Sequence, residues 1–433
     1  MKRLCFALGM LGCLSWAPCA HANGRFPSAG HVEVDPADPA HIVLRATYGL
    51  LVTHDGGSRW DWICESAMGF SGIWDPPIGI TAGGAILVGL ADGLSISTPD
   101  ACQFSRVASL EGKFVADLAV GKKNPARAVV LTSIPLGATF DTRLFLTEDG
   151  GSSFIQIGNV FSENLRGLTV DLAPSDPSIV YVSGVVGGPM PRGVVLRSLD
   201  SGNSYDTWDV PFSDDEHAPF IGAVDPQNVD RLYVRLDGIP GRLFVTENGG
   251  ATWQEIFSGE GALLGLALSP DGKTLVLGGE KDGVWRTPVP NWAFEQTSLL
   301  HARCLRWADA GIYACTEQVL DGFSVGLSVT EGATFKPLAL LSDVCGPVSC
   351  PLPICASEWP ALSDLVNATS CVEASSSSSS GGGGAAGAGG SSNGPPSAVG
   401  GCSCRAGRSG DDGMAFLSLA TLAFWRMRRR RVS

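Results

Sequence analysis

The stretch Leu51–Trp60 reads LVTHDGGSRW, and close copies return as LFLTEDGGSSF at Leu144–Phe154 and as LFVTENGGATW at Leu243–Trp253. In each copy an apolar run leads into Asp or Asn, then into glycines, then into an aromatic residue. An acid that recurs beside glycine and an aromatic ring is either a catalytic carboxylate or a structural turn residue. The role of Asp55 in the first copy therefore decides where the function of this chain should be sought.

The turn returns along the chain with a period of roughly 41 to 51 residues, which lies in the range of propeller blades. Its copies are centred on Asp55, Asp100, Asp149, Asp200 and Asn248. A degenerate copy lies at Val289–Trp292 and a shortened one around Glu331. The repeat therefore predicts seven units.

Each unit contains four short runs of strand-forming residues. In the first unit these runs, strands A to D, are VEVDP, HIVLRAT, LLVTHD and SRWDWIC, and Pro, Gly, Asp and Asn separate them as turns do. No convincing amphipathic helix occurs between Gly24 and Leu341. Four antiparallel strands repeated seven times predict an all-β fold, a seven-bladed β-propeller over residues 24–341. A β-helix or tandem β-sandwiches fit the period and the strand count less well.

The residues of the turn have a mechanical explanation. An Asp or Asn side chain accepts hydrogen bonds from backbone N–H groups just ahead of it and closes the turn, and the glycines that follow supply positive φ angles. Asn248 replaces the acid in one good copy, an exchange that a structural turn tolerates and a general acid does not. The residues predicted to be structural are Asp55, Asp149, Asp200 and Asn248.

The pattern S/T-x-D-x-G-x-x-W/F resembles the Asp-box, also called the bacterial neuraminidase repeat. Four copies match it well, at Thr53–Trp60, Thr147–Phe154, Ser198–Tyr205 and Thr246–Trp253. Asp-box propellers include sialidases, and the chain also looks like the sortilin and photosystem II assembly-factor propellers, which are non-catalytic binding scaffolds. The resemblance implies the propeller fold and fixes no ligand.

Strand order predicts which face of the propeller carries a site. In an up-and-down blade, the A–B and C–D turns lie on one face, and the B–C turns and D–A crossings lie on the other. The Asp turns join C to D, so they are spread around one face and do not converge. Insertions rich in Gly, Pro and apolar residues interrupt the B–C connections at Ser133–Arg143, Val185–Gly193, Leu236–Arg242 and Glu317–Phe323. Because function tends to lie on loops held by a rigid scaffold, we expect a protein or glycan ligand on the B–C face.

A sialidase-like exo-glycosidase is the enzyme alternative. Such an enzyme needs an arginine cluster for the substrate carboxylate, a nucleophile and an acid. Arg25-Phe26-Pro27 resembles the arginine motif of the family only weakly. No Tyr–Glu pair is evident among the five tyrosines. The sequence leaves undecided whether three arginines meet to bind the substrate carboxylate; the candidates are Arg25, Arg45, Arg143, Arg192, Arg235 and Arg306.

Both ends of the chain look like export signals. Residues 1–22 combine Lys2 and Arg3 with an apolar run and a small-residue site, which predicts a secretory signal peptide rather than a membrane anchor. Residues 375–401 are almost entirely Ser, Gly, Ala and Pro, which predicts a disordered linker.

Residues 402–433 hold Cys402, a short apolar helix and an arginine cluster, and they resemble the myxobacterial C-terminal sorting signal. That resemblance implies cleavage by a sorting protease at the membrane and anchoring of the protein at the cell surface. An ordinary tail anchor is the alternative, although the apolar run is short for a span.

Eight cysteines remain between the two terminal signals. An even number in an exported chain favours disulfides, with the pairing left open. They are Cys64, Cys102, Cys304, Cys315, Cys345, Cys350, Cys355 and Cys371. The last four lie in a Cys-rich segment, residues 342–374, which we expect to pack on the propeller. A metal site there is disfavoured because the C-x-x-C spacing and a nearby histidine are lacking.

Charge excludes some classes of partner. The full chain carries a net charge of −13, and removal of both terminal signals would make it more acidic. Nucleic acid and anionic lipid are disfavoured, since both need basic patches. No cofactor motif is found; the acidic run SDDEH at Ser213–His217 lacks an EF-hand pattern. The sequence therefore predicts a surface-anchored binding module, with a sialidase-like hydrolase and a purely structural surface component as alternatives.

Overall fold

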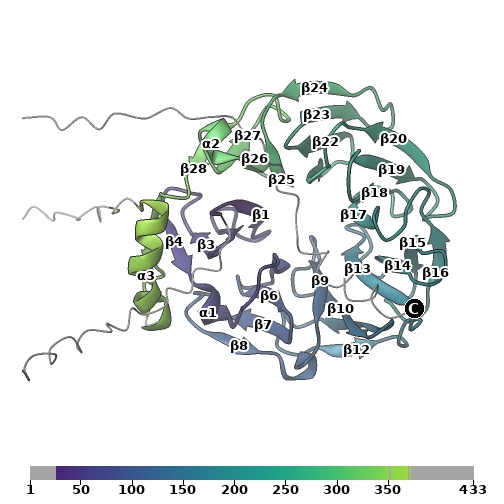
Figure 1. Cartoon of the computed structure of the whole chain (residues 1–433), viewed down its shortest axis with the longest axis horizontal. Coiled ribbons are helices and arrows are strands. Elements are labelled where there is room, and N and C mark those ends of the chain that lie inside the picture. The colour runs from purple at the N-terminus through teal and green to yellow at the C-terminus, as the bar shows by residue number, and fades with distance from the viewer. Residues whose placement is uncertain (1–25, 351–352, 369–370, 372–433) are drawn as a thin grey trace, which may run out of the picture. The chain divides into compact units, whose positions relative to one another are not determined.

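Seven sheets form the blades of a β-propeller (Figure 1); each contains four antiparallel strands in chain order, and the first sheet has one further strand. The computed structural model describes residues 26–350, 353–368 and 371. The expected signal peptide, Ser/Gly linker and C-terminal sorting segment lie outside these residues. Within each blade the first strand, A, lines the centre and the fourth, D, lies outermost. The prediction of seven four-stranded blades is confirmed.

The strands of blades 1 to 3 are β1 (Ala29–Val34), β2 (Ile42–Ala46), β3 (Gly49–Thr53), β4 (Trp60–Ile63), β5 (Ile78–Ile80), β6 (Ile86–Leu90), β7 (Gly93–Ser97), β8 (Phe104–Arg106), β9 (Val115–Val120), β10 (Ala128–Leu136), β11 (Thr139–Thr147) and β12 (Ile155–Ile157). Those of blades 4 and 5 are β13 (Leu165–Leu172), β14 (Val180–Val186), β15 (Arg192–Ser198), β16 (Asp206–Asp209), β17 (Pro219–Val224), β18 (Leu232–Leu236), β19 (Arg242–Thr246) and β20 (Gln254–Ser258). Those of blades 6 and 7 are β21 (Gly265–Leu268), β22 (Thr274–Gly279), β23 (Gly283–Pro288), β24 (Glu295–Ser298), β25 (Ala302–Ala308), β26 (Gly311–Thr316), β27 (Val325–Ser328) and β28 (Lys336–Ala339).

The two middle strands of a blade are apolar on both faces because a neighbouring blade covers each face. Every residue of β3 and of β6 is buried. One hydrophobic cluster joins Val43 and Leu50 of blade 1 to Ile86 and Val88 of blade 2. The outer strand β16, with sequence DTWD, is exposed throughout. Since buried apolar surface stabilises a fold by about 25 cal/mol per Å², these interblade clusters supply most of the cohesion.

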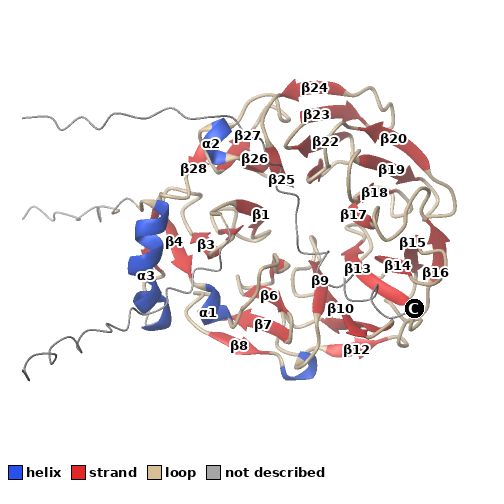
Figure 2. Ribbon diagram, viewed as in Figure 1, coloured by secondary structure: helices blue, strands red, loops and turns tan. Residues whose placement is uncertain are grey.

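Helices are few and lie at the edges of the sheets (Figure 2). Single turns occur at α1 (Glu65–Met68), η1 (Ala108–Leu110) and α2 (Gln318–Asp321). A longer helix, α3 (Pro353–Val366), lies outside β4 in Figure 1. In the part of the chain that the structure describes, no helix combines the length and the apolar character needed to cross a membrane.

The ring closes without a strand shared between the two ends. Blade 1 and blade 7 are each complete, and Glu33 of β1 forms an ion pair with Arg306 of β25 at 2.7 Å across their junction. A fifth strand, β29 (Val344–Pro347), adds to the outer edge of blade 1 and runs parallel to β4. The segment after blade 7 therefore acts as a clasp on blade 1.

Four disulfides pair all eight cysteines between the terminal segments. Cys64 at the end of β4 bonds to Cys355 of α3, and Cys102 in the C–D turn of blade 2 bonds to Cys350. The remaining bonds are Cys345–Cys371 within the C-terminal segment and Cys304–Cys315 across the β25–β26 hairpin. Two of the four bonds tie the clasp to blades 1 and 2.

Removing a clasp disulfide should destabilise the fold more than removing the hairpin disulfide. Cys64 and Cys355 are separated by 291 residues, and Cys304 and Cys315 by 11. The intact Cys102–Cys350 bond shortens the loop that Cys64–Cys355 closes to about 44 residues, so the chain-entropy model gives an extra loss of about 1 kcal/mol over the hairpin bond. Guanidinium unfolding of Cys64→Ser/Cys355→Ser and of Cys304→Ser/Cys315→Ser checks this order. Equal losses would contradict a clasping role.

Candidate functional site

The propeller has two chemically different faces. On the first, which we call the turn face, A–B and C–D turns are bonded together; Gly150 N donates to Ala126 O at 2.9 Å. On the second, the loop face, B–C loops meet the D–A crossings; Gly187 N donates to Asn164 O at 2.8 Å. All four insertions noted in the sequence lie at B–C connections on the loop face, but the expected loop at Ser133–Arg143 is mostly an extension of the β10–β11 hairpin.

The Asp turns form closed hydrogen-bond networks. Asp55 Oδ1 accepts bonds from the backbone N–H groups of Ser58 at 2.8 Å and Arg59 at 2.9 Å, and from Thr53 Oγ1 at 2.8 Å. Gly57 N donates back to Thr53 Oγ1 at 3.0 Å. The side chain thus holds the C–D turn, and Asp149 and Asp200 repeat the pattern.

The same bonds keep these carboxyls ionised. The hydroxyl of Ser153 and backbone donors lower the pKa of Asp149 to about 2, and Ser204 does the same for Asp200. Partial burial alone would raise the pKa of Asp55, but the bonds from Arg59 N, Thr53 and Ser58 N lower it overall. A carboxylate held ionised by several donors is a poor proton donor.

The side chain of Asn248 closes its C–D turn in the same way as the aspartates close theirs. Its Oδ1 accepts bonds from Thr252 N at 2.9 Å and from Thr246 Oγ1 at 3.0 Å. An amide oxygen therefore keeps two of the three bonds that Asp55 accepts, and the amide nitrogen adds one to Thr252 Oγ1 at 2.9 Å.

The glycine two residues after the acid is needed for close packing. Gly151 has a φ of +98°, and a Cβ there would lie 2.5 Å from Ile96 Cδ1 of the preceding blade. The turn therefore packs closely against the preceding blade as well as within its own blade.

Substitutions at Asp55 should separate a structural role from a catalytic one. Asp55→Ala removes an acceptor for three donors, so we expect a loss of about 1–2 kcal/mol in the free energy of unfolding. Asp55→Asn should cost much less, as the natural turn at Asn248 indicates. Urea unfolding of both variants, with Asn248→Asp as the matched reverse exchange, provides the measurement. A large loss in Asp55→Asn would contradict this account.

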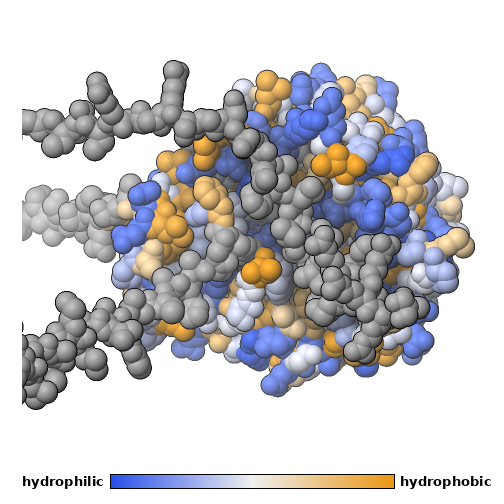
Figure 3. Space-filling view, viewed as in Figure 1, coloured by the Kyte–Doolittle hydropathy of each residue, from blue (hydrophilic) through white to orange (hydrophobic). Residues whose placement is uncertain are grey.

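The loop face carries most of the exposed apolar side chains. Eleven large hydrophobic residues in the described ranges are exposed there: Phe26, Ile73, Leu136, Val160, Met190, Phe212, Ile239, Leu264, Leu299, Val319 and Leu320. Among the same described residues, the turn face has only Leu199 and Val329. On the face seen in Figure 3, hydrophobic residues lie as separate spots among hydrophilic ones. The apolar side chains of the loop face therefore sit on separate loops and crossings.

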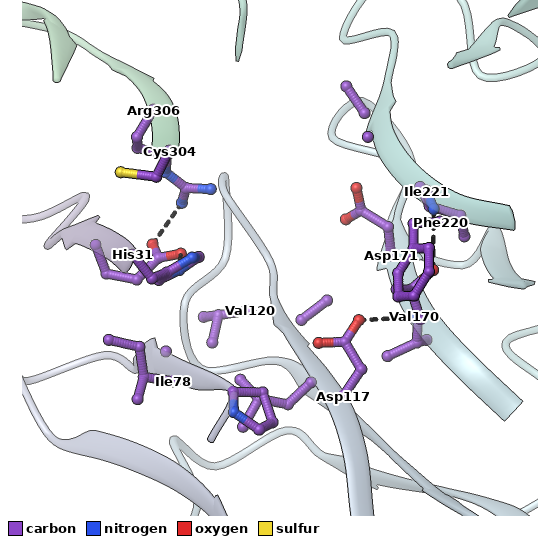
Figure 4. Close-up of a pocket in the computed structure, with 18 of the residues that line it drawn as sticks. His31, Ile78, Asp117, Val120, Val170, Asp171, Phe220, Ile221, Cys304 and Arg306 are labelled. Atoms are coloured by element: carbon purple, nitrogen blue, oxygen red, sulfur yellow. Dashed lines mark hydrogen bonds and ion pairs between the residues drawn. The ribbon is translucent and has the colours of Figure 1, made fainter. Parts of the chain in front are cut away.

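The centre of the ring encloses a cavity of about 460 Å³ that the innermost strands of all seven blades line. In Figure 4, His31 and Arg306 lie on one side of it, and Asp117 and Asp171 lie on the other. The cavity holds charged groups of both signs in a chain whose net charge is −13.

Glu33 is the centre of the charged cluster on one wall. Its carboxylate oxygens contact His31 Nε2 at 2.9 Å and Arg306 Nη2 at 2.7 Å. Burial would raise the pKa of Glu33, but Arg306 and His31 lower it overall, while burial lowers the pKa of His31. At neutral pH the cluster is therefore an ion pair with a neutral imidazole, and it joins blade 1 to blade 7.

On the opposite wall of the cavity, the ionised form of two carboxyl groups is disfavoured. Burial raises the pKa of Asp117 to about 7, although its Oδ2 accepts a bond from Val170 N of the next blade at 2.9 Å. Burial also raises the pKa of Asp171, against the lowering effect of Lys122. The sequence analysis missed both residues. The signal that would have found them is an acid within the apolar innermost strand of a blade.

Asp117→Asn should change how stability depends on pH. The folded pKa is raised above the usual value, so the folded state binds more protons than the unfolded state between about pH 4 and pH 7. This group therefore stabilises the wild type at low pH, and the contribution is lost as pH rises to 7. We expect Asp117→Asn to unfold at a higher temperature than the wild type at pH 8 and at nearly the same temperature at pH 4.

Asp149→Asn is the control for that experiment. Its carboxyl has a pKa of about 2, so it stays ionised throughout the range. A relative gain at pH 8 in the control, or none in Asp117→Asn, would rule out burial of Asp117 as the cause.

Three of the six arginines considered for a substrate carboxylate line the cavity, and each has its own contact. Arg45 donates to Pro76 O at 2.9 Å, Arg306 pairs with Glu33, and the Arg235 guanidinium lies 4.8 Å from the centre of the Phe220 ring. The others lie elsewhere: Arg143 and Arg192 pair with Asp141 and Asp209, and Arg25 is outside the described residues.

None of the five tyrosines, all within the described ranges, lines the cavity. Tyr48 donates to Leu341 O at 3.3 Å and Tyr181 donates to Val229 O at 2.8 Å. Tyr205, Tyr233 and Tyr313 pack with the hydrophobic clusters of the blades. The cavity therefore lacks the Tyr–Glu pair that the sialidase alternative requires.

The fold is shared with proteins of unrelated function. An ancestral GH74 enzyme aligns with a TM-score of 0.55 and 16% identity over 72% of this chain and 46% of that chain, so this chain spans about half of that enzyme. Kuenenia stuttgartiensis hydrazine synthase aligns with a TM-score of 0.53 and 13% identity over 72% of this chain and 99% of that chain. At such identities the likeness shows the fold alone. No family model and no curated protein matches the sequence.

Proposed function

We propose that this chain is a secreted, surface-anchored β-propeller that binds a protein or a surface glycan through its loop face without transforming it. The observation that carries the proposal is the distribution of exposed apolar side chains, eleven on the loop face against two on the turn face. These side chains lie on separate loops and form no single patch, so they favour the loop face as a whole, whose connections a rigid scaffold holds, as the place of binding. The turn face, by contrast, is occupied by the closed networks around Asp55 and its equivalents.

The terminal segments support the location of this function. Residues 1–22 would export the chain, residues 375–401 would form the tether, and cleavage near Cys402 would anchor it at the outer surface. The four disulfides fit an oxidising compartment. In this assignment, residues 24–341 form an Asp-box propeller and residues 342–374 its clasp.

The principal alternative is a sialidase-like exo-glycosidase, and a structural surface component is the second alternative. Against the hydrolase stand the positions of the tyrosines and the separate partners of Arg45, Arg235 and Arg306. The raised pKa values of Asp117 and Asp171 are the features of the cavity that resemble a catalytic acid. A fluorogenic sialoside therefore belongs in the test, and turnover abolished by Arg306→Gln would favour the enzyme.

Binding should depend on the loop face and not on the turn face. We expect Met190→Ser/Ile239→Ser to weaken binding of a glycan or protein ligand by tenfold or more, because both side chains are exposed on B–C loops. Leu199→Ser/Val329→Ser, with side chains 57% and 77% exposed on the turn face, is the control and should leave binding unchanged. A glycan array and surface plasmon resonance against isolated surface proteins measure the effect. Equal losses in both variants, or no saturable ligand, would contradict the proposal.

A further inference from the structure

The loop face holds one exposed aromatic side chain on a strained backbone. Phe212 lies in the crossing from blade 4 to blade 5, and 69% of it is exposed. Its φ is +59°, in the left-handed region that residues other than glycine avoid. Such a conformation costs roughly 1–2 kcal/mol. A large aromatic residue is thus held in solvent against a conformational cost, a combination that is concentrated at functional sites.

Neighbouring loops fix Phe212 in this position. Val210 N donates to Gly193 O at 2.9 Å, and Gly193 N donates to Ser213 O at 3.4 Å. A Cβ on Gly193 would lie 2.3 Å from Ser213 Oγ, so this approach requires glycine. The guanidinium of Arg242 lies 4.0 Å from the centre of the Phe212 ring. The ring is therefore positioned before any ligand arrives, which reduces the entropy lost on binding.

Apolar side chains on the adjacent loops extend the contact area. Met190 is 86% exposed on the β14–β15 loop, and Ile239 is 70% exposed on the β18–β19 loop. Asp237 N donates to Ala218 O at 2.9 Å, which joins the second loop to the crossing. We name this area the blade 4–5 surface, formed by residues 187–193, 210–218 and 237–241.

The charge that remains free on the blade 4–5 surface is negative. Its arginines are already engaged, Arg192 with Asp209 and the underlying Arg242 with Glu255. Among the carboxylates, Asp214 contacts His217 and Asp215 pairs with Arg166, whereas Glu216 has no ion pair in the described ranges and Asp237 acts only through its charge on the buried Arg235. Complementary charge steers association and selects the partner, so the partner should carry Lys or Arg near its apolar contact.

The chemistry of the exposed side chains favours a polypeptide over a sugar. Sugar rings stack on flat aromatic faces, most often Trp or Tyr. None of the eleven exposed hydrophobic residues of the loop face is Trp or Tyr, and nine are aliphatic or Met. Met adapts to irregular apolar surfaces, and Phe, Met and Arg are enriched in protein interfaces.

We infer that the blade 4–5 surface binds a polypeptide whose contact segment combines apolar side chains with lysine or arginine, with Phe212 as the anchor. The inference rests on the proposed function and selects protein from its two ligand classes. One anchored aromatic residue with flanking apolar contacts is the usual composition of a binding hot spot.

Synthetic peptides test the inference on the full chain. The probes are labelled twelve-residue peptides of alternating Leu and Lys, Leu and Glu, and Leu and Ser, measured by fluorescence anisotropy. We expect the Leu–Lys peptide to bind most tightly and Phe212→Ser to weaken it by tenfold or more, about 1.4 kcal/mol. Glu216→Gln/Asp237→Asn should weaken it and reduce its dependence on salt. Leu199→Ser, the turn-face control, should bind as the wild type does.

Phe212→Gly distinguishes a binding role from a structural one. Glycine adopts a positive φ without strain, so the variant should unfold at the same or a higher temperature while it loses peptide affinity. A joint fall in melting temperature and affinity would overturn the anchor role, as would wild-type affinity in Phe212→Ser. If a glycan binds saturably to the loop face and no peptide does, this inference fails and the proposed function stands. If neither binds, both fail.

Discussion

The structure depends on the burial of each blade's middle strands between its two neighbours. A strand such as β3 or β6 has no exposed residue, so no blade can fold as a stable unit in isolation. Adjacent blades must therefore meet at a fixed distance all around the ring. The ring junction meets the same requirement, with the Glu33–Arg306 ion pair added to the packing of β1 against blade 7.

That requirement explains the residues of the Asp turn. The turn must connect its two strands compactly, and the hydrogen bonds to Asp55 achieve this. The turn must also pack against the preceding blade. Gly151 shows the second condition, since a methyl group there would collide with Ile96. The polar groups of these turns are used internally, and a second cavity, of about 740 Å³, lies against the C–D turns of blades 2 and 3. The connections on the loop face do not have to form such compact turns. They therefore vary in length and leave Phe212, Met190 and Ile239 exposed.

The central cavity is also shaped by the ring. Innermost strands from seven blades converge there, so charges far apart in the sequence come within reach of one another. Asp117 illustrates the effect, because its own strand is apolar and its bonding partner, Val170, belongs to the next blade. The repeat pattern does not reveal this group. Only an acid out of place in an apolar run hints at it.

The sequence by itself determined the number of blades, the strand order and the face on which each turn lies. These features are local, since a repeated turn and alternating short strands define a unit whatever surrounds it. Tertiary structure alone decided the disulfide partners, the addition of β29 to β4 and the shift in the pKa of Asp117. Each of these depends on distances between residues remote in the chain, and a single sequence does not encode such distances in any local pattern. The positive φ of Phe212 belongs with them, because its crossing lies against Gly193 of another strand and no local pattern marks it.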